Sequence, residues 1–221
     1  MPRKPLLILS PTGRSAAIAV LMLALLAGSL GLAWALTGAP LVPPGPPPPT
    51  AHDLGGATLE LPPTWVADPA AARPDANPAR WVFINTASPG ERLSVWYLRS
   101  PESIEPAQVL GQAVQSSIAG KHFVVAPDSP ERFRLSEQPA GPGMVMEIVF
   151  SSQRATRTSS GASPEVQAMI LVTADRQDYW VYRFTDQVPQ ERWVRDLEDR
   201  QLERLRHWVG SAADAPAKMA P

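Results

Sequence analysis

The chain has 221 residues, with 20 Lys and Arg against 21 Asp and Glu, and a formal net charge of −1. It has no cysteine, which excludes disulfides, thiolate metal sites, thiol catalysis and a lipoprotein anchor. The balanced charge offers no basic field for nucleic acid, so no nucleic-acid partner is expected. The scarcity of lysine relative to arginine is typical of a GC-rich bacterial genome and carries no functional information.

One apolar run, residues 15–36, has neither a charge nor a proline over its 22 residues. This length is enough for a helix to cross a bilayer. Arg3, Lys4 and Arg14 precede the run, and the next basic residue after it is Arg73. Because short positive flanks stay in the cytoplasm, we expect a single-pass protein of the cell membrane with its N-terminus inside and its C-terminal domain outside.

A cleaved signal peptide is the main alternative, since Ala33-Trp34-Ala35 has the small-x-small pattern of a cleavage site. The apolar run, however, is longer than the usual core of a signal peptide, which favours a retained anchor. A buried helix of a soluble domain is a third and weaker interpretation. Both leading interpretations export the rest of the chain.

The anchor divides the chain into segments of different composition. Residues 37–56 contain a run of prolines, Pro46 to Pro49, and predict a polyproline linker that reaches roughly 60 Å when extended. The end of the chain is rich in small residues and proline, which is typical of disorder. The predicted organisation is a cytoplasmic tip at 1–14, a transmembrane helix at 15–36, a linker at 37–56, an exported domain at 57–210 and a disordered tail at 211–221.

Within the exported domain, strands dominate the middle and a helix ends the chain. The first half of the domain is predicted to contain a strand at Thr58–Leu61, a loop at 65–79, a hairpin of Trp81–Thr86 and Arg92–Leu98, and a helix from Ser103 or Pro106 to about Ile118. Strands are predicted next at Phe123–Val125, Phe133–Glu137 and Met144–Phe150, followed by a loop at Ser151–Pro164 and strands at Val166–Val172 and Tyr179–Phe184. The chain is then predicted to form a terminal helix with Pro189 in its first turn.

The terminal helix carries one apolar stripe, which must cover an apolar sheet face. Its charged residues are expected to face solvent, in pairs worth tenths of a kcal/mol each. The fold class that follows is α+β, an antiparallel sheet with helices packed on it. The stripe consists of Val194, Leu197, Leu202, Leu205, Trp208 and Val209.

The segment Gly55 to Trp65 (GGATLELPPTW) reads as a strand followed by a leucine-proline-x-x-tryptophan motif. This opening, together with the order of hairpin, helix, meander and terminal helix, resembles the PsbP/Mog-like α/β/α sandwich superfamily over about residues 54–210. The superfamily is defined by its fold and not by a shared active site. The resemblance therefore implies an accessory or partner-binding role and transfers no catalytic residue.

The motifs that would carry catalysis or hold a cofactor are missing from the sequence. The histidines, His52, His122 and His207, stand in no metal-binding array. There is no Gly-x-Ser-x-Gly elbow, no Ser-x-x-Lys, and no glycine-rich phosphate loop. We expect no metal, no cofactor and no enzymatic activity.

Three residues are the candidates for binding a partner. Trp96 lies opposite the Leu93, Val95 and Tyr97 face of its strand, so it marks a binding face if no helix covers it. Arg154 and Arg157, in the polar loop, are suited to contact an acidic partner or an anionic headgroup. The alternatives are a core tryptophan and a solvated hairpin loop.

The favoured function is a membrane-anchored extracytoplasmic domain that binds an envelope protein partner without catalysis. The second hypothesis is a carrier of a small molecule or lipid on the sheet face, which requires a roofed apolar cavity. The third is an enzyme whose site brings together scattered residues such as His122, Asp175 and Asp178.

Overall fold

The structure is a computed structural model that describes residues 47–140, 143–154 and 163–212. The chain divides into two units, Met1–Pro47 and Pro48–Pro221, and the strands and helices described below belong to the second. In these described ranges, no helix is long and apolar enough to cross a membrane. The run 15–36, predicted as the anchor, lies outside them.

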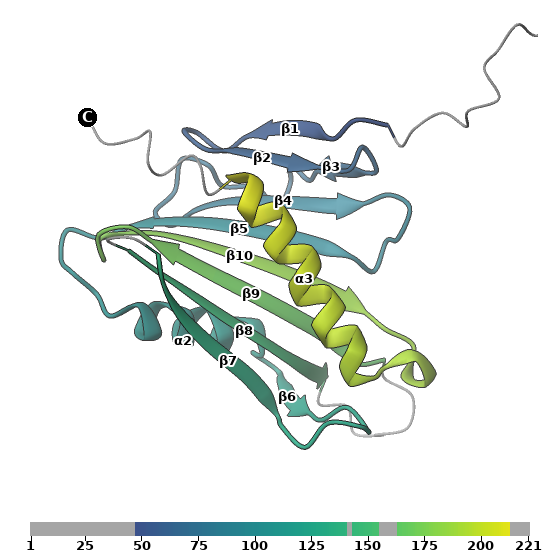
Figure 1. Cartoon of the computed structure of the whole chain (residues 1–221). Helices are drawn as coiled ribbons and strands as arrows, with labels where there is room; N and C mark the ends of the chain where they lie inside the picture. The colour runs from purple at the N-terminus through teal and green to yellow at the C-terminus, as the bar shows by residue number, and fades with distance from the viewer. Residues whose placement is uncertain (1–46, 141–142, 155–162, 213–221) are drawn as a thin grey trace, which may run out of the picture. The chain divides into compact units, whose positions relative to one another are not determined.

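An antiparallel sheet of eight strands forms the centre of the domain (Figure 1). Its order is β3-β4-β5-β10-β9-β8-β6, and β7 also pairs with β8, beside β6. The strands are β3 (Trp65–Ala67), β4 (Ala79–Asn85), β5 (Arg92–Arg99), β6 (Lys121–Val124), β7 (Phe133–Ala140), β8 (Gly143–Arg154), β9 (Glu165–Thr173) and β10 (Asp178–Gln187).

The two faces of the sheet carry different layers, because successive strand residues point to opposite sides. On one face lie helix α3 (Arg195–Ala212) and a separate hairpin of β1 (Thr50–Asp53) and β2 (Thr58–Leu61). On the other face lies helix α2 (Pro106–Ser117), which packs mainly over β8 and β9. Figure 1 shows α3 in front of the sheet and α2 behind it.

Each face has its own apolar cluster. On the α3 face, Trp208 packs edge to face against Trp65 and Phe184, whose rings are tilted to each other, and the ring centroids are 5.1 to 6.0 Å apart. On the α2 face, Val109 and Leu110 of the helix cluster with buried residues of β8, β9 and β10. The expected α+β fold, with helices on an antiparallel sheet, is confirmed.

The predicted hairpin is confirmed as β4 and β5, which pair in register, and the predicted mid-chain helix is confirmed as α2. Four local predictions were wrong. Thr50–Asp53, within the segment predicted as linker, form β1, and Trp65–Ala67, within a predicted loop, form β3. The predicted loop at Ser151–Pro164 begins too early, since β8 runs on to Arg154. Pro189 precedes a short 3-10 turn, Gln190–Arg192, and the terminal helix starts only at Arg195.

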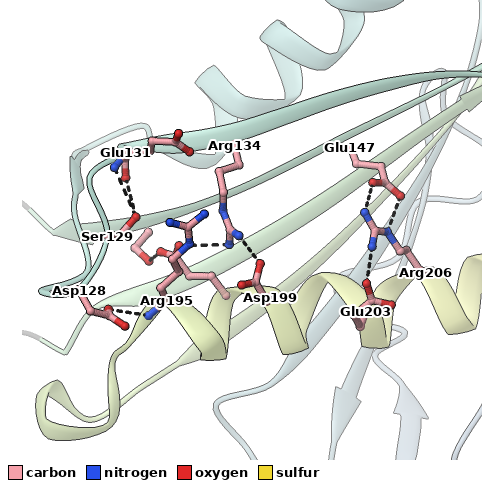
Figure 2. Close-up of polar contacts among 11 residues, drawn as sticks. Asp128, Ser129, Glu131, Arg134, Glu147, Arg195, Asp199, Glu203 and Arg206 are labelled. Carbon is pink, nitrogen blue, oxygen red and sulfur yellow. Dashed lines mark hydrogen bonds and ion pairs between the residues drawn. The ribbon is translucent and has the colours of Figure 1, made fainter.

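Helix α3 is fixed to the sheet by ion pairs as well as by its apolar stripe. Arg206 donates to both carboxylate oxygens of Glu147 on β8, at 2.8 and 2.5 Å, and also pairs with Glu203. Arg134 of β7 pairs with Asp199 and donates from the sheet to the helix (Figure 2). At the start of the helix, the backbone N–H of Arg195 donates to Asp128 Oδ1 at 2.8 Å.

A second bidentate pair joins α3 to the turn between β4 and β5. Arg204 donates to both oxygens of Glu91, at 2.9 and 2.8 Å, while its guanidinium lies 4.9 Å from the ring centroid of Phe184. The expectation that the charged residues of this helix only face solvent was wrong for Arg204 and Arg206. Bidentate pairs with buried carboxylates hold α3 in register more strongly than exposed pairs do.

The Glu147–Arg206 pair makes the stability of the fold dependent on pH. The hydrogen bonds from Arg206 lower the pKa of Glu147 below its ordinary value, against the opposing effect of burial. A carboxyl with a lowered folded-state pKa stabilises the fold above its unfolded-state pKa, and this stabilisation is lost as the pH falls through the folded-state pKa. Glu147→Gln should therefore lower the free energy of unfolding by roughly 1–3 kcal/mol at pH 7 and by much less near pH 3.

Thermal melts of the full chain from pH 3 to pH 8 measure this difference. Glu203→Gln is the matched control, because Glu203 is exposed and pairs with the same arginine. A destabilisation by Glu147→Gln that stays constant with pH would contradict the assignment.

Candidate functional site

Trp96 lies on the α2 face of the sheet, at the centre of β5. Its direct neighbours across the strands are Arg80 on β4 and Val181 on β10, and Arg183 lies one diagonal step away on the same face. The helix covers this face only in part, since α2 packs mainly over β8 and β9 and Trp96 stays partly exposed. The register of three strands thus places two arginines beside one indole ring.

Both guanidinium groups lie close to the indole ring. The Cζ atom of Arg183 is 4.7 Å from the ring centroid of Trp96, and that of Arg80 is 5.6 Å away. The two charges are therefore no more than about 10 Å apart. Cation–π contact with an indole offsets part of the cost of desolvating a guanidinium, but it does not neutralise the charge.

Neither arginine has a carboxylate partner in the part of the chain that the structure describes. The Nε atoms of Arg80 and Arg183 are buried and make no hydrogen bond there, and the same holds for the hydroxyl of Ser94, which is next to Arg183 in register. Three other half-buried arginines, Arg134, Arg204 and Arg206, are each paired with a carboxylate.

The electrostatic environment of Arg183 is unfavourable for its charge. The pKa of Arg183 is lowered to about 10, chiefly by burial and also by the positive charges of Arg80 and Arg92, while the negative charge of Glu165 opposes the shift. Glu165 itself is engaged by Lys121, whose Nζ lies 2.5 Å from the carboxylate. The guanidinium stays protonated at neutral pH, so this face holds a positive charge that lacks a close counter-charge.

A small apolar groove adjoins the arginines, with Trp96 as the shared wall. It lies between β5 and α2, has a volume of about 190 Å³ and opens to solvent. Pockets that hold whole small molecules are typically about 300 to 1,000 Å³. The groove is thus suited to an apolar side chain and is too small for the roofed cavity that the carrier hypothesis requires. Its apolar lining comes from Pro78, Trp96, Leu98, Val109, Ala113 and Val181, and Gln112 and Ser116 stand at its polar side.

The predicted binding residues do not form one site. Arg154, at the end of β8, is exposed and lines a polar pocket of about 360 Å³ with Lys121 and Glu165. Counting across the sheet from β5 through β10 and β9 to β8, Trp96 is in register with Met146. Arg154 lies eight residues beyond Met146 along β8, so Trp96 and Arg154 are roughly 30 Å apart. Arg157 lies outside the described residues.

The residues of the enzyme hypothesis are not brought together. Asp175 accepts hydrogen bonds from the backbone of Gln177 and Asp178 in the turn between β9 and β10. His122 pairs with Gln153 at the opposite end of β8, roughly 30 Å from this turn. No group of three or more potential metal ligands occurs among the residues that the structure describes.

The sequence holds a signal for this site that belongs to none of the catalytic or metal-binding motifs. Arg183 is the only charged residue inside the apolar strand Tyr179–Phe184 (YWVYRF), and Arg80 opens the apolar run of the predicted hairpin. A charge inside an otherwise apolar strand is expensive, so it indicates either a buried pair or a site. Only the strand register shows that both arginines adjoin Trp96.

Taken together, the domain is an α/β/α sandwich with a half-open sheet face. It has the PsbP/Mog-like fold that the sequence predicted. The Ran-binding protein Mog1p of Saccharomyces cerevisiae is similar in structure, with a TM-score of 0.50, 10% sequence identity, and coverage of 76% of this chain and 93% of Mog1p. At this identity the likeness shows the fold alone.

The PsbP protein of the cyanobacterium Synechocystis (CyanoP) also matches, with a TM-score of 0.49, 11% identity, and coverage of 78% of this chain and 96% of that protein. No protein-family model and no curated protein matches the sequence.

The unpaired charge of Arg183 predicts an unusual stability effect. Arg183→Gln keeps a polar, though shorter, side chain and removes both the desolvation cost of the charge and the repulsion from Arg80, which together outweigh the lost cation–π contact. The variant should gain on the order of 1 kcal/mol in the free energy of unfolding, which raises Tm by a few degrees. Thermal melts at low ionic strength measure this gain.

Arg200→Gln is the control, because Arg200 is exposed on α3, on the other face of the sheet. It removes the same charge and should leave Tm unchanged. A clear fall of Tm in Arg183→Gln would mean that the arginine serves the fold.

Proposed function

We propose that this protein is a single-pass membrane protein whose exported α+β domain binds a protein partner in the cell envelope and has no catalytic activity. In this proposal residues 15–36 are the anchor, residues 1–14 remain in the cytoplasm, and the proline-rich segment before β1 is a stem that holds the domain away from the bilayer. The apolar run and the basic residues that precede it support the anchor and its orientation.

The single observation that carries the binding role is the pair of unpaired arginines around Trp96, at the rim of an open apolar groove. Exposed aromatic and arginine side chains are the residue types that dominate binding energy at protein interfaces. The shared fold adds support, because it is also the fold of the Ran-binding protein Mog1p. The partner surface proposed here is the Trp96 face, defined as Arg80, Trp96, Arg183 and the groove between β5 and α2.

The anchor and its orientation are open to a direct test. Alkaline phosphatase fused to the C-terminus should be active in bacterial cells, because the fusion lies outside the cytoplasm. The protein should stay in the membrane fraction after an alkaline carbonate wash, and its mass should include the residues before position 36. Release of a chain that begins after Ala35 would instead establish a cleaved signal peptide.

The partner surface is tested by site-specific photocrosslinking in native membranes. A benzoylphenylalanine in place of Gln112, which is exposed at the side of the groove, should yield a discrete adduct that mass spectrometry identifies. Introducing Trp96→Ala should reduce that adduct at least tenfold, as expected for the loss of an aromatic hot spot.

The matched control places the same crosslinker at His207, which is exposed on α3 and so belongs to the opposite face. Equal adducts from both positions, or none from either, would contradict a partner surface at Trp96.

A further inference from the structure

The Trp96 face combines two features that seldom occur side by side. One is a pair of guanidinium groups that share an indole ring and leave two buried Nε donors unused. The other is an apolar groove of about 190 Å³ that Trp96 also lines. A ligand that satisfies both must carry a negative charge and an apolar group a few ångströms apart.

The charge of the ligand follows from the arginines. A guanidinium is a planar fork of donors that matches an oxyanion in a bidentate manner. The structural arginines of α3 illustrate this within the same domain, since Arg204 and Arg206 each hold a carboxylate by two hydrogen bonds. Arg80 and Arg183 have the same capacity, and the described part of the fold supplies them with no carboxylate.

The size and shape of the groove decide what kind of anion fits. An inorganic phosphate would leave the apolar groove empty. A lipid acyl chain needs more room than about 190 Å³ and a more enclosed space. One apolar side chain fits, and in a protein segment it can stand next to an aspartate or a glutamate.

We propose that the Trp96 face binds a segment of a partner protein in which a carboxylate side chain stands next to a large apolar side chain. The carboxylate accepts hydrogen bonds from the guanidinium groups that flank the indole ring, and the apolar side chain occupies the groove between Trp96 and α2. This inference rests on the proposed function and adds the chemistry of the partner to it. Binding supplies the counter-charge that the free domain lacks and covers the exposed part of Trp96.

The test is a selection of phage-displayed random 12-residue peptides on the full-length protein in detergent. The enriched peptides should share an Asp or Glu adjacent to Leu, Ile, Phe or Trp. The double variant Arg80→Gln/Arg183→Gln should bind them at least tenfold more weakly, while the exposed control Arg200→Gln binds them as the unmodified protein does. Replacing the shared acid in a synthetic peptide by Asn or Gln should cause a comparable loss, and binding should weaken as salt is added.

A second pair of variants tests the groove separately from the charges. Ala113→Trp fills the groove from the side of α2, and Gln115→Trp adds the same side chain at an exposed position that does not line it. The first should weaken peptide binding at least tenfold and the second should not. Circular dichroism of each variant establishes that the fold is retained.

The outcomes separate this inference from the proposed function. Peptides that lack a shared acid but still depend on Trp96 would overturn the acidic ligand and leave the binding surface in place. If no peptide is enriched, or if the enriched peptides bind the Trp96→Ala, Arg80→Gln and Arg183→Gln variants as strongly as the unmodified protein, both the acidic ligand and the binding surface at Trp96 are overturned.

Two other occupants are distinguished by further measurements. Sedimentation of the nanodisc-embedded protein with phosphatidylglycerol vesicles, lost in the double arginine variant, would assign the site to an anionic membrane surface. A dimer that forms at low salt and disappears in the same variant would assign it to a second copy of the chain. Either result would overturn a partner-protein segment as the occupant.

Discussion

The architecture of this domain depends on how unequally the two faces of its sheet are covered. Seven strands side by side span roughly 30 Å, while α2, with 12 residues, is only about 18 Å long. The opposite face is covered by α3, which has 18 residues, together with the β1–β2 hairpin. Because α2 packs mainly over β8 and β9, the β4–β5 side of its face keeps Trp96 partly exposed. The candidate site is a consequence of this incomplete cover.

The treatment of charge differs between the two faces. On the α3 face, burial of charge is compensated, since Arg204 and Arg206 form bidentate pairs with Glu91 and Glu147. On the α2 face, Arg183 is held near a second positive charge without a carboxylate of its own. A sequence that served stability alone would place an apolar residue there. Destabilised groups of this kind are typical of surfaces whose interactions are completed by binding.

Much of the fold was predictable because its local patterns are strong. The β4–β5 hairpin and α2 follow from alternation and helical spacing, and both are confirmed. The failures have a common cause. Short elements such as β1, with four residues, and β3, with three, are too short to show a periodic pattern, so their strand conformation depends on pairing with β2 and β4. The charges of α3 were misjudged because the helix alone does not reveal which strand residues face it.

The candidate site was predictable only in part. The alternation of β5 predicts that Trp96 faces away from Leu93 and Val95, and the strand in the structure has this alternation. Arg154 is also an exposed residue at the end of a strand, but it lies far from Trp96 along β8. Arg80 was missed because it belongs to another strand, and nothing in the local pattern links the two residues.

By itself, the sequence determined the secondary structure of the long elements, the α+β class and which residues of each strand share a face, because these follow from periodicity along a single segment. Tertiary structure decided which strands are neighbours and in what register, how far each helix covers its face, and which charges find partners. These depend on contacts between residues far apart in the chain. The juxtaposition of Arg80, Trp96 and Arg183, from three different strands, is of this second kind.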